Sequence, residues 1–116
     1  MNNNPLSSQH HFISLEEATK LTRSFREKGE QLLDPAQQGK NVLAISESFN
    51  RAAIEAILNQ DGCSGIRLYS GLKEDGRLHQ VLVGINEKDE DMCEGILVED
   101  SRRCPPDCAP PSPLNS

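Results

Sequence analysis

Cysteines are the residues of this sequence whose type and spacing best suit chemistry. Two of the four, Cys104 and Cys108, form a C-x3-C pair with two prolines between them. Zinc needs about four sulfur or nitrogen ligands, of which this pair supplies two. The three histidines show no H-x3-5-H spacing that would complete the set. We therefore predict no cofactor and no metal site, and leave zinc at Cys104 and Cys108 as an open alternative.

The same pair is also a candidate for thiol redox chemistry. Thioredoxin-type sites place the reactive thiol at a helix N-terminus, where its pKa falls. Pro105 and Pro106 follow Cys104, and prolines are tolerated in a first helical turn, but no helical pattern continues past Cys108. The other interpretation is two reduced thiols in a mobile tail. A metal-binding or thiol-redox module using Cys104 and Cys108 is thus the alternative function.

A nucleophilic cysteine would need a histidine base within hydrogen-bond reach. Cys63 lies in a small-residue turn and is better explained as a buried small apolar residue. His79 lies within residues 12–100, where a folded domain is expected. In the hairpin expected over 65–85 it lies opposite Gly71, at the far end from Cys63. The sequence also has no G-x-S-x-G, H-E-x-x-H, phosphate-loop or dinucleotide motif. We predict no catalytic residue, and the chain is interpreted as a non-enzymatic protein.

Acidic residues dominate the charge of the chain. Asp and Glu number 18 against 12 Lys and Arg, for a net charge of −6, which argues against nucleic acid as a partner. Many acids lie between Glu87 and Asp100, but the D-x-[DN]-x-[DN]-G calcium pattern is absent, so a solvated turn is expected. No apolar run is long enough for a membrane span, and no secretory signal is present. The sequence predicts a soluble, cytoplasmic protein.

The chain divides by composition into three parts. Residues 1–11 carry no Lys, Arg, Asp or Glu and are expected to be flexible. Residues 12–100 are expected to form a single α+β domain. Residues 101–116 hold five of the seven prolines and two of the cysteines, which predicts an extended tail with polyproline character.

Two helices are expected in the first half. Ser14 and Glu17 fit a capping box at the start of a helix over 15–28, with Gly29 as its stop. A second helix is expected over about 50–60. The apolar run 42–45 is either a strand or a buried loop. The three phenylalanines of this half, which we expect in the core, are Phe12, Phe25 and Phe49.

Past Gly62 the apolar period changes from near 3.6 to 2, which indicates strands. Strands are expected over 65–70 and 78–85, joined by a three-residue loop in which Gly76 supplies the positive φ. That loop pairs residues whose numbers sum to 150 and sets apolar residues against one another. A third strand over 95–99 completes an antiparallel meander. The predicted fold is α+β, with two helices packed on a small antiparallel three-stranded sheet and disordered termini.

The chain carries GCSGIRLY at 62–69, Asp75-Gly76, Leu82-Val83-Gly84 and a CPPDC segment at 104–108. Together these stretches resemble a family of short, uncharacterised bacterial proteins, over roughly 12–108. The family has no established activity, so the resemblance carries over no catalytic residue. It implies a bacterial, cytosolic protein in which the two helices and the hairpin form one unit.

A sheet face carrying Arg67, Tyr69 and His79 is the candidate binding face. An Arg, an aromatic and a His on one face could bind an anionic or aromatic group, or could form the amphipathic outer face of a half-exposed sheet. Tyr and Arg are enriched at protein interfaces, which favours a protein over a small substrate. We therefore expect an interaction module with a protein partner or self-association.

Overall fold

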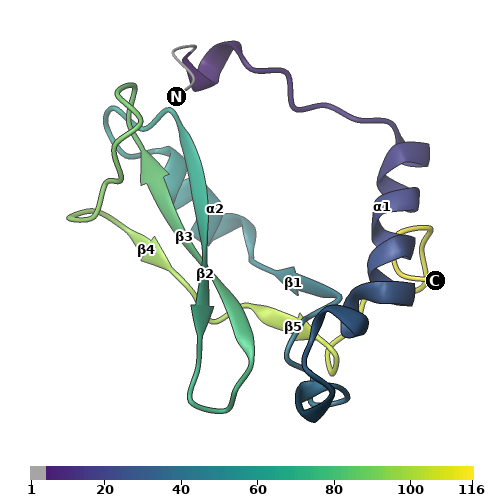
Figure 1. Ribbon diagram of the computed structural model, residues 1–116. Helices are drawn as coiled ribbons and strands as arrows, with labels where there is room; N and C mark the ends of the chain where they lie inside the picture. The colour runs from purple at the N-terminus through teal and green to yellow at the C-terminus, as the bar shows by residue number, and fades with distance from the viewer. Residues whose placement is uncertain (1–4) are drawn as a thin grey trace. The chain divides into compact units, whose positions relative to one another are not determined.

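The computed structural model describes residues 5–116 (Figure 1). The chain forms two compact units. The first unit comprises residues 5–11, Phe49–Gly71 and Gln80–Ser101. The second comprises Phe12–Ser48, Leu72–His79 and Arg102–Ser116. The α+β class, the two helices and the three-stranded antiparallel sheet agree with the sequence prediction.

The three-stranded sheet is a meander in the order β2–β3–β4, formed by β2 (Gly65–Leu72), β3 (Leu78–Ile85) and β4 (Leu97–Val98). β4 is shorter than expected and pairs Leu82 with Val98. The β2–β3 loop closes as predicted: the Lys73 amide donates to the Arg77 carbonyl at 3.1 Å, and Gly76 has a φ of +84°.

Helix α2 (Arg51–Leu58) is fixed to this sheet by its apolar face and by a glutamine just past its end. Asn50 caps the helix by accepting from the Ala53 amide, as expected for an Asn N-cap. Ile57 is fully buried and lies against Gly84 of β3. Gln60 accepts from the Ile96 amide at 2.8 Å, which holds the start of β4 near the helix.

Helix α1 (Leu15–Lys28) begins as the capping box predicts, with the Ser14 hydroxyl accepting from the Glu17 amide at 3.0 Å. The helix ends at Lys28 with Gly29 as its C-cap, as predicted, but without a left-handed residue. The φ of Gly29 is −59°, and the chain continues into a 3-10 turn, η2 (Gly29–Leu32). A glycine is needed here because a Cβ would come within 2.9 Å of the Phe25 ring.

A second, two-stranded antiparallel sheet was not predicted. It pairs β1 (Ser46–Ser48) with β5 (Arg102–Cys104), and Ser46 lies opposite Cys104. The run 42–45 is a loop and not a strand, since β1 starts only at Ser46; within it Val42 is buried and Ile45 is exposed. The expected tail over 101–116 therefore begins with an ordered strand, because β1 supplies hydrogen-bonding partners that a local pattern cannot reveal.

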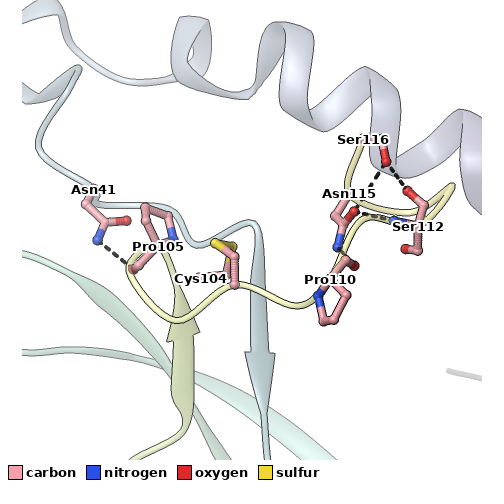
Figure 2. The surroundings of a disulfide bond; sticks show 8 residues. Asn41, Cys104, Pro105, Pro110, Ser112, Asn115 and Ser116 are labelled. Carbon is pink, nitrogen blue, oxygen red and sulfur yellow. Dashed lines mark hydrogen bonds between the residues drawn. A yellow bond between two sulfur atoms is a disulfide. The ribbon is translucent and has the colours of Figure 1, made fainter.

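The remaining short elements are η1 (Leu6–Ser8) and η3 (Pro35–Gln37). The last residues form a compact turn in which Asn115 accepts from the Ser112 amide and donates to the Pro110 carbonyl (Figure 2). Arg26 of α1 donates to the carbonyls of Leu114 and Ser116, the latter at 2.7 Å.

The prediction of a phenylalanine core is wrong. Phe12 is 83% exposed, Phe25 is also exposed, and Phe49 is half-buried. Phe25 lies against the backbone of Gly29 at the end of its own helix instead. The core consists of small aliphatic and sulfur side chains, divided between the units: Ile57, Leu82, Val83 and Ile85 in the first, Val42 and Cys104 in the second.

Candidate functional site

Two members of the predicted binding face, Arg67 and Tyr69 of β2, lie together in the first unit. The Arg67 guanidinium donates to Asp91 Oδ1 at 2.6 Å and also pairs with the carboxylate of Asp89. The Tyr69 hydroxyl donates to the second oxygen of Asp91. These four side chains form what we call the β2 cluster.

The β2 cluster changes the pKa values of its members. The pKa of Asp91 is lowered, first by the hydrogen bond from Tyr69 and then by the one from Arg67. The pKa of Tyr69 is raised, chiefly because its phenolic proton is held by the Asp91 carboxylate. The pKa of Arg67 is raised mainly by its hydrogen bond to Asp91. Each shift favours the protonation state that keeps the cluster together near neutral pH.

The charge of the β2 cluster argues against a role in binding anions. Arg67 carries one positive charge and already contacts two carboxylates, so its donors are engaged within the chain. Asp89 and Asp91 are therefore paired with Arg67, whereas the sequence predicted a solvated acidic turn. The arrangement fastens the turn after β3 to β2.

His79, the third residue of the predicted face, is not brought into the β2 cluster. It belongs to the second unit and is buried. Arg67 and Tyr69 share one face of β2, since residues two apart in a strand point the same way. The register did not reveal that the acidic turn would return to that face.

The sequence analysis missed Asp89 and Asp91 as partners of β2. Their position depends on the turn over 86–90, where Asn86 Oδ1 accepts from the amides of Lys88 and Glu90. Asp89 adopts a φ of +65°, which Asp tolerates better than most residues. The sequence held one signal for this contact: Asn86 begins the acidic turn, and a neighbouring strand carries Arg67.

Cys104 and Cys108 form a disulfide in the second unit, with their Cα atoms 4.5 Å apart. Their sulfurs are bonded to each other, so neither is a thiolate ligand in this state. Cys63 and Cys93 are free thiols; the Cys63 thiol donates to the Gly65 carbonyl at 3.2 Å. Within residues 5–116, no three His, Cys, Asp or Glu side chains gather as a metal-binding group.

Arg103 anchors the strand that carries the disulfide. Its side chain is buried, and its guanidinium donates to the carbonyls of Asn41 and Val42 at 3.2 and 3.1 Å. The side-chain nitrogen Nδ2 of Asn41 in turn donates to the Pro105 carbonyl at 3.1 Å (Figure 2). The loop between the two cysteines is thus tied to the chain before β1.

Helix α1 lines an apolar recess in the second unit. The recess has a volume of about 290 Å³ and is lined by α1 and by the chain just before β1, through Leu21, Thr22, Phe25, Ala44 and Ile45. Leu21 is 65% exposed, and within the described chain none of the fourteen residues of α1 is buried. An apolar helix face of this kind is normally covered.

No family model, curated protein or solved structure matches this chain. The resemblance to short bacterial proteins therefore stays a prediction. None of the helices in residues 5–116 is long and apolar enough to cross a membrane.

Proposed function

We propose that this protein is a small non-enzymatic interaction module that associates with a second copy of itself through α1. The observation that carries the proposal is the exposed apolar face of α1, with Leu15 and Leu21 both open to solvent. A helix of fourteen residues is marginal in water without tertiary packing. A partner that covers this face would remove apolar surface from water and stabilise the helix.

The charges of α1 favour a second copy as the partner. The first turn is acidic, with Glu16 and Glu17, and the last turn is basic, with Arg26 and Lys28. Two copies of α1 packed antiparallel would set the acidic end of each against the basic end of the other. A two-fold interface of this kind is self-complementary, and two-fold dimers are the commonest assemblies of soluble proteins.

Sedimentation equilibrium over about a hundredfold range of protein concentration tests the proposal. We expect the mass to rise from the 12.8 kDa monomer toward twice that value. Leu21→Ser should weaken association by at least about tenfold, because it removes a central apolar contact. Leu68→Ser is the matched control, since Leu68 is 58% exposed but lies on β2 of the first unit.

A charge exchange tests the antiparallel arrangement. Glu17→Lys should weaken association, and adding Lys28→Glu in the same chain should restore it, because the interface would again pair opposite charges. Circular dichroism of each variant checks that α1 is retained. A wild-type mass that stays at 12.8 kDa throughout would overturn the proposal.

A second candidate function is thiol–disulfide chemistry at Cys104 and Cys108. The observation that favours it is the disulfide itself. In the cytoplasm, where we propose that the protein resides, disulfides are usually transient and serve catalysis or redox sensing. Thiol counting after equilibration in graded glutathione buffers tests it: two thiols should appear and disappear reversibly, and a pair that native protein never releases would contradict this function.

A further inference from the structure

The two sulfurs of the disulfide differ in access. Cys104 is 3% exposed and belongs to β5, whereas Cys108 is exposed and lies beyond the strand. An incoming thiolate must reach the sulfur that it attacks along the S–S axis, so access decides which of two bonded sulfurs reacts. The structure therefore distinguishes the two cysteines.

The backbone of Cys104 is held in place from the neighbouring strand. Its carbonyl accepts from the Ile45 amide at 2.8 Å, and Ser46 lies opposite it in the β1–β5 ladder. The adjacent Arg103 adds two hydrogen bonds to carbonyls before β1. None of these contacts involves the disulfide, so they can keep Cys104 in place after the S–S bond is cut.

Cys108 is carried on a short turn instead. Its amide donates to the Pro106 carbonyl at 3.2 Å, and the Asp107 amide donates to the Arg103 carbonyl at 2.9 Å. Figure 2 shows the chain leaving this turn toward Pro110. Cys108 therefore lies outside the β1–β5 ladder, with its side chain at the surface.

We propose that Cys108 is the sulfur that exchanges with an external dithiol, and that Cys104 is the buried thiol released in the first step. This inference rests on the second candidate function. A thiolate of the dithiol attacks Cys108 Sγ, forming a mixed disulfide. The S–S bond to Cys104 breaks, its electron pair stays on Cys104 Sγ, and that thiolate takes a proton from water.

The second thiol of the dithiol then completes the exchange. Its thiolate attacks the dithiol sulfur bonded to Cys108, and Cys108 leaves as a thiolate. The protein disulfide is reduced to two thiols while the dithiol is oxidised to a disulfide. The reverse sequence, beginning with the exposed Cys108 thiolate on an external disulfide, reoxidises the protein. The substrate class is thus a small or protein dithiol–disulfide couple.

Trapping of the mixed disulfide tests this order. The full chain with Cys63→Ser and Cys93→Ser is exposed briefly to glutathione, a monothiol with no second thiol to resolve its own adduct. It is then quenched at once with an alkylating agent, which blocks the freed Cys104 thiol before that thiol can expel glutathione. Peptide mass spectrometry should show glutathione on Cys108 and the alkyl group on Cys104. Glutathione mainly on Cys104 would overturn the order while leaving thiol redox chemistry intact.

Single-thiol variants give an independent measurement. In the same background, Cys104→Ser leaves only Cys108, and Cys108→Ser leaves only Cys104. We expect an aromatic disulfide reagent to react at least about tenfold faster with Cys108 in native protein, and equally fast with both in denaturant. Equal native rates would overturn the inference. A disulfide that glutathione never opens in the native chain would instead remove the second candidate function itself.

Discussion

At the residue scale, the most constrained group of side chains is the β2 cluster. Tyr69 and Arg67 each offer a donor to Asp91, and Asp91 meets them with separate oxygens. A carboxylate with both oxygens engaged has a lowered pKa, and a phenol that donates to a carboxylate has a raised one. The β2 cluster therefore gives two measurable pKa shifts: that of Tyr69 lies above neutral pH, and that of Asp91 lies below it.

The titration of Tyr69 is the first expected outcome. The pKa of Tyr69 lies above its ordinary value of 10.0, because the hydrogen bond to Asp91 is lost on ionisation. Stability from this bond is present below that value and is lost as the pH rises through the folded-state pKa. Tyr69 is the single tyrosine and the chain has no tryptophan, so near-ultraviolet absorbance follows it alone. Asp91→Asn should bring the midpoint down toward 10.

Acid stability gives the second expected outcome. The pKa of Asp91 lies below its ordinary value of 3.8, so the unfolded chain binds the proton at higher pH than the folded chain. The stabilisation is therefore present above that value and lost as the pH falls through the folded-state pKa. Urea unfolding should show wild type more stable than Asp91→Asn near neutral pH, with the gap closing below about pH 4.

The control for acid stability is Asp61→Asn. Asp61 is an exposed carboxylate in the turn after α2 and lies outside the β2 cluster. Its substitution removes one carboxylate without altering the β2 cluster and should not reproduce the effect of Asp91→Asn. If Asp61→Asn and Asp91→Asn behaved alike, the assigned role of Asp91 would be wrong.

At the element scale, two glycines allow α2 and the sheet to approach closely. A Cβ on Gly84 would come within 2.9 Å of Gln60 Nε2, 3.1 Å of Cys63 Sγ and 3.3 Å of Ile57. A Cβ on Gly95 would clash with Gln60 Oε1. Gln60 thus fills the space that both glycines leave.

Gly84→Ala should destabilise the protein by about 1–2 kcal/mol, because the added methyl overpacks this contact. Urea unfolding measures the change. The double-mutant cycle with Gln60→Ala isolates the cause: if Gln60 is the main obstacle, the added cost of Gly84→Ala should fall in that background. A cost that Gln60→Ala leaves unaltered would place the obstacle at Cys63 or Ile57 instead.

At the scale of the whole molecule, the small aliphatic core limits stability. Two compact units share 116 residues, and small domains bury a smaller fraction of their surface than large ones. An exposed apolar helix in such a chain is a liability unless something covers it. Self-association through α1 would add buried apolar surface that the monomer lacks.

A concentration-dependent melting temperature is the expected outcome at this scale. Ligand or partner binding to the native state stabilises it by mass action, so Tm should rise with protein concentration. Differential scanning calorimetry measures the rise, and Leu21→Ser should reduce it. A Tm independent of concentration in wild type would contradict association through α1.

The sequence by itself determined the local elements. Ser14 marked the start of α1 because its hydroxyl satisfies an amide that the helix leaves without a partner. Gly76 marked the hairpin turn because its φ is positive, and the alternation of apolar residues gave β3 its bounds. Each of these features depends on neighbours close in sequence, which is why pattern reasoning found them.

The tertiary structure alone decided the long-range pairings. The β1–β5 sheet and the contacts of Arg67 with the turn after β3 bring partners together in ways that no local period encodes. The tertiary structure also decided which side chains are buried. The phenylalanines expected inside lie at or near the surface, because short aliphatic side chains fill both cores. Which side chain meets which depends on how strands pair in space, and that pairing decided both candidate sites.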